Sequence, residues 1–139
     1  MSRLKKIAAA LLMVGAMGGS VLTASSASAA NQDGTPNDGE FVFYYNSGCA
    51  NALSDFTGSH KTLNGYVFLT SLPGHGQAVK NNSACGGNFN FNSNVRVYFN
   101  SYCQGINDLI PARQYGNFTN VYNENASFKF LASSYNCAA

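Results

Sequence analysis

A hexapeptide of aromatic, turn-forming and cysteine residues occurs twice in this chain, as YYNSGC at 44–49 and as YFNSYC at 98–103. The similarity extends beyond the hexapeptide, because FVFYYNSGCANALSDF at 41–56 aligns with VRVYFNSYCQGINDL at 95–109. An internal repeat of this kind restricts the chain to folds that contain two similar units.

A second pair of stretches shows that the two units differ in length. QAVKNNSAC at 77–85 corresponds to TNVYNENAS at 119–127, and each places a Val before an Asn-led turn. The offset between copies falls from 54 to 42 residues, so the first copy carries about twelve extra residues near SLPGHGQ. The predicted units span about 41–92 and 95–131.

Each unit shows the two-residue period of β-strands. Alternation in FVFYY places Phe41, Phe43 and Tyr45 on one face, and Arg96 marks the opposite, outer face in the second copy. Gly, Asn and Ser interrupt every window that could sustain a helix, so we predict an all-β sandwich. The predicted core consists of Phe41, Phe43, Tyr45, Phe89, Phe91, Val95, Val97, Phe99, Phe128 and Phe130.

The doubled aromatic strand, its Y-N-S turn and the later Asn-led turn resemble the βγ-crystallin fold. In particular, they resemble the small exported bacterial proteins grouped with the Streptomyces metalloproteinase inhibitor. The resemblance covers about 39–131 and implies two Greek-key units, packed as two four-stranded sheets that exchange one strand. It also implies peptidase inhibition.

This chain departs from the family pattern in its hairpin turns. Cys49 and Cys103 occupy a position that is usually aromatic, and only Gly105 keeps the glycine that normally follows. The family's reactive loop has no counterpart that aligns, so no scissile bond is transferred to this chain.

The first thirty residues are typical of a secretory signal peptide. A basic start, a short apolar stretch and an A-x-A pattern follow one another in order. We therefore expect residues 1–30 to be removed, the protein to be secreted, and no membrane association to remain. The polar segment NQDGTPNDGE at 31–40 is predicted to be a flexible N-terminal arm, followed by the folded domain at 41–139.

The charge balance argues against nucleic acid as a partner. The chain carries eight Lys and Arg against six Asp and Glu, but Arg3, Lys5 and Lys6 lie in the predicted signal peptide. The mature chain would then have five cations, six acids and a net charge of −1. Binding to a phosphate backbone requires several neutralising cations.

All four cysteines lie in the predicted mature chain, as expected for disulfides in an exported protein. Pairing within each unit would join Cys49 to Cys85 and Cys103 to Cys137. Because Cys49 and Cys103 hold equivalent positions, a bond between the two repeats is the alternative. We favour pairing within the units.

The Asn-led turns are candidate calcium loops, since a βγ-crystallin site uses Asn or Asp followed by hydroxyl residues. Cys85 and Phe128 stand where hydroxyl ligands belong, and Glu124 is the only acid. We expect weak calcium binding at most, with turn formation by asparagine as the alternative role. No other cofactor is expected. The candidate ligands are Asn81, Asn82, Asn123, Glu124 and Ser127.

No catalytic site is predicted. His60 and His75 both lie in the long first-unit loop, where they are expected to be surface residues, and no hydrolase or metalloprotease motif accompanies them. We expect a secreted, non-catalytic domain that binds another protein, most of all a peptidase. The alternatives are an adaptor in a secreted assembly, such as an antibacterial toxin complex, and a calcium- or sugar-binding structural protein.

Two segments are candidates for the protein-binding surface. The first is the extra loop of the first unit, which an inhibitor would use because substrate-like binding needs an exposed, restrained segment. The second is the arm at 31–40, which could order on a partner. The candidate loop consists of Leu72, Pro73, Gly74, His75 and Gly76.

Overall fold

The computed structural model describes residues 31–139, which form seven β-strands and no helix. The predicted signal peptide at 1–30 lies outside the described residues. Residues 31–139 contain no helix with the length and apolarity needed to cross a bilayer. The strands are β1 (Phe41–Asn46), β2 (Ala50–Phe56), β3 (Cys85–Asn88), β4 (Val95–Asn100), β5 (Gln104–Ile110), β6 (Tyr115–Asn117) and β7 (Ser127–Phe130).

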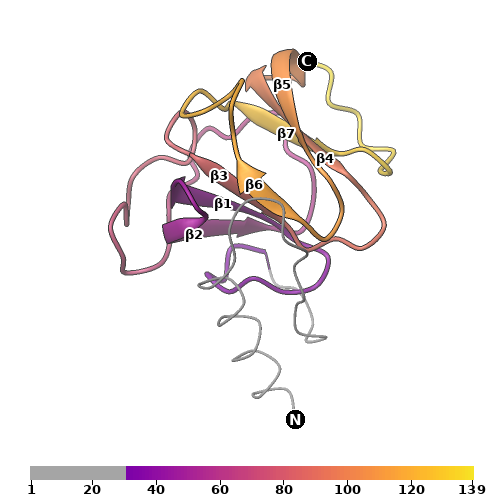
Figure 1. The fold of residues 1–139 in the computed structure, drawn as a ribbon. Coiled ribbons are helices and arrows are strands. Elements are labelled where there is room, and N and C mark those ends of the chain that lie inside the picture. The colour runs from indigo at the N-terminus through magenta and orange to yellow at the C-terminus, as the bar shows by residue number, and fades with distance from the viewer. Residues whose placement is uncertain (1–30) are drawn as a thin grey trace.

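The strands form two antiparallel sheets packed as a sandwich, which confirms the predicted all-β class (Figure 1). The first sheet has the order β2-β1-β3-β6, and the second has the order β5-β4-β7. Sheets of alternating strands bury one face each against the other, and this explains why the aromatic alternation repeats in both units.

Each half of the chain contributes backbone to the sheet of the other half. Strand β6 comes from the second half but pairs with β3, with Gly86 opposite Gly116. In the opposite direction, His60 from the first half pairs with Phe128 of β7 through two backbone hydrogen bonds of 3.1 Å. The two halves therefore complete each other.

The repeated hexapeptide encodes a hairpin turn with positive φ at equivalent positions. Cys49 and Cys103 have φ of 52° and 54°, while Asn51 and Gly105 have φ of 68° and 85°. Asparagine and glycine tolerate this region best. Both hairpins also carry a register shift, between Tyr44 and Asn46 in the first and between Tyr98 and Asn100 in the second.

The centre of the sandwich is an aromatic cluster around Phe128. Its ring centroid lies 5.1 Å from Phe43, 5.2 Å from Phe56 and 5.6 Å from Phe41, mostly edge to face. Such geometry is favourable for aromatic quadrupoles. The core prediction is confirmed for Phe41, Phe43, Val95, Val97, Phe128 and Phe130, whereas Phe89 is buried in a separate cluster on the outer face of the first sheet.

The core prediction is wrong for Phe91 and Phe99, which are 44% and 36% exposed, and Tyr45 is only half-buried. Tyr45 and Phe99 stand at the two register shifts, where strict alternation ends. Phe91 lies beyond β3 and packs under the Arg113 guanidinium, 4.7 Å from the ring centroid to Cζ.

The outer face of the first sheet also carries a buried apolar cluster. It contains Val42, Tyr44, Cys49, Cys85, Phe89 and Tyr115, with Leu53 packed against it. This face is not the polar surface that one-sided alternation would produce. Sequence alternation alone could not reveal a second covering layer.

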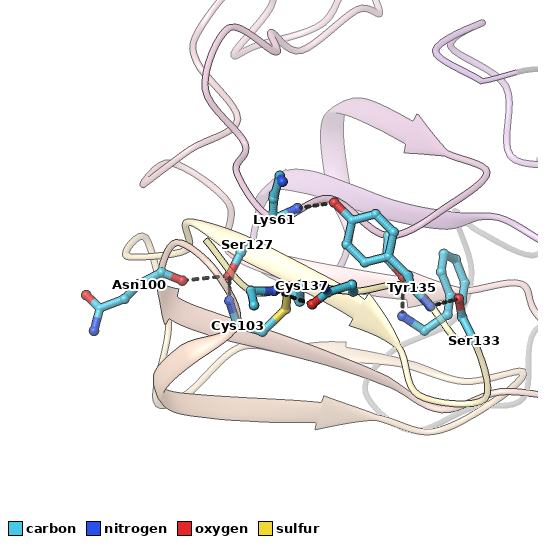
Figure 2. Close-up of a disulfide and its surroundings, with 11 residues drawn as sticks. Lys61, Asn100, Cys103, Ser127, Ser133, Tyr135 and Cys137 are labelled. Atoms are coloured by element: carbon cyan, nitrogen blue, oxygen red, sulfur yellow. Dashed lines mark hydrogen bonds between the residues drawn. A yellow bond between two sulfur atoms is a disulfide. The ribbon is translucent and has the colours of Figure 1, made fainter.

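The disulfides join Cys49 to Cys85 and Cys103 to Cys137, which confirms pairing within the units. The two bonds also indicate an oxidising compartment. They are not equivalent, since Cys85 begins β3 whereas Cys137 lies in the tail after β7 (Figure 2).

Ser127 explains this difference, because it occupies in β7 the place that Cys85 has in β3. Its Oγ accepts a 3.0 Å hydrogen bond from the Cys103 N–H and donates a 2.6 Å bond to the Asn100 carbonyl. Figure 2 shows that Cys103 instead reaches the tail, where the Tyr135 hydroxyl also accepts a 3.0 Å bond from the Lys61 N–H.

We predict that Phe43→Ala lowers the free energy of unfolding by ~3–5 kcal/mol, because it removes a ring that contacts both sheets. Phe99→Ala is the matched control. Phe99 lies in the other hairpin, two residues beyond the position equivalent to Phe43, and its truncation should cost about 1 kcal/mol or less. Urea unfolding measures both. Equal losses would contradict the assignment of the core.

Replacing Cys49 and Cys85 together with Ser should lower the free energy of unfolding by about 3–4 kcal/mol, since the bond closes a long loop in the unfolded chain. The same change at Cys103 and Cys137 should cost a similar amount, because the sequence separations are 36 and 34. Urea unfolding of the two double variants provides the check. A variant as stable as the wild type would refute the corresponding estimate.

Candidate functional site

An open apolar groove of about 510 Å³ lies on the outer face of the first sheet. The arm forms one side, the β1–β2 turn forms another, and Leu72 stands at the rim. Tyr44 and Leu53, from the apolar cluster on the outer face of the first sheet, form part of its lining. The lining residues are Gly34, Thr35, Pro36, Tyr44, Gly48, Cys49, Ala50, Asn51, Leu53 and Leu72.

The arm at 31–40 is docked on the domain rather than free, contrary to the expected flexible segment. The Asp55 carboxylate accepts hydrogen bonds from the N–H groups of Asp33, at 3.1 Å, and Gly34, at 2.7 Å. Gln32 adds a backbone bond of 2.9 Å to the Asp55 carbonyl and a side-chain bond to Ser54. One wall of the groove therefore depends on Asp55.

Three acids meet where the arm reaches β2. One carboxylate oxygen from each of Asp33, Glu40 and Asp55 lies within 4.8 Å of the other two; Asp33 is exposed, while Glu40 and Asp55 are buried. No sequence pattern indicated this cluster. Two of the acids lie in a segment predicted to be flexible, and no spacing pattern connects them to the third.

Burial is the main cause of the raised pKa values of Glu40 and Asp55 in this cluster. It raises the pKa of Glu40 from 4.5 to about 9, partly opposed by the hydrogen bond from the Asn37 N–H and reinforced by the charges of Asp55 and Asp33. Burial likewise raises the pKa of Asp55 from 3.8 to about 6, although the N–H groups of Asp33 and Gly34 oppose the shift. Glu40 is therefore neutral near pH 7.

The candidate loop at 72–76 forms a tight turn on the edge of β2. The Pro73 carbonyl accepts a 3.1 Å bond from Ala52, and the His75 N–H donates a 2.9 Å bond to the Leu72 carbonyl. Gly74 has φ of 97°, and the Tyr45 ring occupies the space that a side chain would need there. Leu72 remains 51% exposed, so the loop offers the groove an apolar rim.

The two Asn-led turns pair with each other. Asn81 and Asn123 have φ of 64° and 53°, the region in which asparagine favours turns. The Asn81 N–H donates to the Asn125 carbonyl at 2.9 Å, and the Asn123 N–H donates to the Ser83 carbonyl at 3.0 Å. These bonds bring the candidate calcium loops into contact.

Only part of the predicted calcium ligand set converges. Asn81 and Glu124 line one polar hollow of about 290 Å³. Asn82 donates its side-chain amide to the Ala78 carbonyl at 2.9 Å, and the Ser127 hydroxyl is engaged with Asn100. Of these two, the Ser127 Oγ is the ligand atom committed to bonds that stabilise the fold, because it also accepts from the Cys103 N–H.

The two histidines have different surroundings. His60 is half-buried between Phe56, Tyr66 and Phe128, and desolvation lowers the pKa of its imidazole. It is thus a packing residue rather than the surface residue that the sequence suggested. His75 is exposed, with Nδ1 3.1 Å from the Thr70 carbonyl oxygen.

Comparison with protein-family models, with curated proteins and with solved structures found no match to this chain. Its function therefore has to be inferred from its own residues.

Glu40 should make the stability of the protein fall as pH rises. An acid whose pKa is higher in the folded state than in the unfolded state stabilises the fold fully at pH values below its unfolded pKa, here 4.5. This stabilisation is lost progressively as the pH rises to the folded pKa of about 9. In metal-free buffer, the free energy of unfolding should decline between neutral pH and pH 9, by up to about 1.4 kcal/mol per pH unit.

Urea unfolding across this range tests the assignment to Glu40. Glu40→Gln should flatten the decline, because a neutral amide replaces the titrating carboxyl. Glu124→Gln, which changes an exposed acid, should leave the decline intact. A flat profile for the wild type would show that Glu40 titrates as an ordinary carboxyl.

Proposed function

We propose that this chain is a secreted, non-catalytic domain that binds another protein, and that its groove receives an apolar side chain of the partner. The observation that carries the proposal is the convergence of three segments on one open apolar groove. Apolar pockets that accept an anchoring side chain are a common basis of protein recognition. Leu72 and Pro36, which both line the groove, would contact that side chain.

The architecture supports a βγ-crystallin-like classification, which remains part of the proposal. Strand β6 joins the sheet of the first half, and the His60 segment pairs with β7 at the edge of the second sheet. The resemblance implies two four-stranded sheets that exchange a strand; the second sheet here has three strands, and the His60 segment adds an isolated bridge at its edge in place of the fourth. The secretory signal at 1–30 and the two disulfides support export.

Peptidase inhibition is the leading version of the proposal, since the resemblance implies it. The loop at 72–76 is a turn anchored to β2 through Pro73, whereas substrate-like insertion into a protease cleft requires an extended segment. An inhibitor of this shape would therefore accept a side chain of the peptidase surface in its groove. The alternative is an adaptor in a secreted assembly, which would use the same groove.

The arm has a different role from the one its sequence suggested. Because 33–34 are bonded to Asp55, the arm acts as a wall of the groove and not as a free segment that orders on a partner. The predicted mature charge of −1 also favours a protein partner over nucleic acid.

The test is inhibition of thermolysin-like and serine peptidases by the chain from residue 31, compared with two variants. Leu72→Asp places a charge at the rim of the groove and should abolish inhibition. Ile106→Asp is the matched control, since Ile106 is also exposed but lies on β5, outside the groove.

The results separate the versions of the proposal. If the wild type inhibits no peptidase in large excess, the inhibitor version is wrong, and capture of a secreted partner by wild type and Ile106→Asp but not Leu72→Asp would support the adaptor. If the two variants behave alike in both assays, the groove is not the binding surface.

A further inference from the structure

The acidic cluster has the dimensions of a coordination shell. Calcium binds oxygen ligands at 2.3–2.6 Å, so two oxygens on opposite sides of one ion lie roughly 4.6–5.2 Å apart. One carboxylate oxygen from each of Asp33, Glu40 and Asp55 lies within 4.8 Å of the other two. A single ion can therefore contact all three carboxylates.

Two buried oxygens at this place lack a donor from any N–H or hydroxyl group. Glu40 has an exposed fraction of 0%, and its Oε2 can share a hydrogen bond only with another carboxyl group, that of Asp55; Asn37 has an exposed fraction of 2%, and its Oδ1 has no hydrogen-bond partner. Asn37 is tied to the cluster, since its N–H donates to Glu40 Oε1 at 2.7 Å and its Nδ2 lies 3.5 Å from Asp33 Oδ2. Buried acceptors without donors are rare and call for an explanation.

The charges around Glu40 are of its own sign. The charged groups that act on it are Asp55 and Asp33, and both are acids. Buried carboxylates in proteins are normally paired with a cation or coordinate a metal, because burial of an uncompensated charge is costly. The exposed position of Asp33 gives an ion and its remaining waters a route from solvent.

We propose that Asp33, Asn37, Glu40 and Asp55 form a binding site for a hard divalent cation, with calcium the best fit. All four supply oxygen, the ligand type that calcium and magnesium prefer. Three of the ligands lie on an irregular segment without helix or strand, whose varied ligand directions suit calcium better than the strict octahedron of magnesium. The ion would fasten the arm to β2, independently of what the groove binds.

This site is separate from the paired Asn-led turns, and the test uses that separation. The chain from residue 31 is titrated with calcium chloride by calorimetry at mildly alkaline pH, and its melting temperature is followed with calcium, magnesium or chelator. We expect one calcium per chain, a Kd on the order of 10⁻⁴–10⁻³ M, and a rise in melting temperature through linkage.

Two variants remove ligands from the proposed site and one serves as control. Glu40→Gln should raise the calcium Kd by about tenfold or more, because it removes a charged ligand with little change of shape. Asp33→Asn, at an exposed position, should weaken binding in the same direction and does not depend on tolerance of a change in the interior. Glu124→Gln removes the only acid of the Asn-led turns and should bind calcium like the wild type.

Hydrogen exchange provides a second readout. Calcium should slow exchange of the arm amides at 33–40 in the wild type and in Glu124→Gln, but not in Glu40→Gln. The proposal is overturned if the wild type shows neither heat nor a melting shift at millimolar calcium, which would leave a proton shared by Glu40 and Asp55 as the explanation. It is equally overturned if Glu124→Gln abolishes binding while Glu40→Gln and Asp33→Asn retain it.

Discussion

The hydrogen bonds from Asp33 and Gly34 to the Asp55 carboxylate fix the arm, and much of the outer face of the first sheet depends on them. A short polar segment has little apolar area with which to dock, so a charge-assisted bond to a buried acceptor has to hold it. Once fixed, the arm encloses the groove and brings Glu40 beside Asp55. The same bonds thus hold one wall of the groove in place and bring the buried carboxyl groups of Glu40 and Asp55 close together.

The parts of the fold that were predictable are those that local chemistry determines. The alternation in FVFYY identified the face that carries Phe41 and Phe43, and the similar size of the two loops that each unit can close correctly suggested disulfides within the units. The errors at Phe91 and Phe99 arise where the two-residue period ends, at a register shift or past the end of a strand. Sequence periodicity carries no signal for the position of such an irregularity.

The candidate site was predictable only in fragments. The loop at 72–76 and the arm at 31–40 were both identified, but as alternatives, since nothing in the sequence shows that two segments so far apart flank one groove. The cluster of three acids could not be predicted for a related reason. Asp33 and Glu40 contribute to an ordinary polar composition, and their proximity to Asp55 is a property of the folded chain alone. Three-dimensional convergence, rather than motif, defines this surface.

Because β6 of the second half belongs to the sheet of the first half, the two copies of the repeat cannot be separated without breaking that sheet. A fragment that ended before β4 would lack β6, and β3 would then present an unpaired backbone edge to solvent. Exposed edges of this kind recruit other strands, so an isolated half would tend to pair with a second copy of itself or to aggregate. Neither half can therefore act as an autonomous folding unit, and formation of the native sandwich must await synthesis of nearly the whole chain.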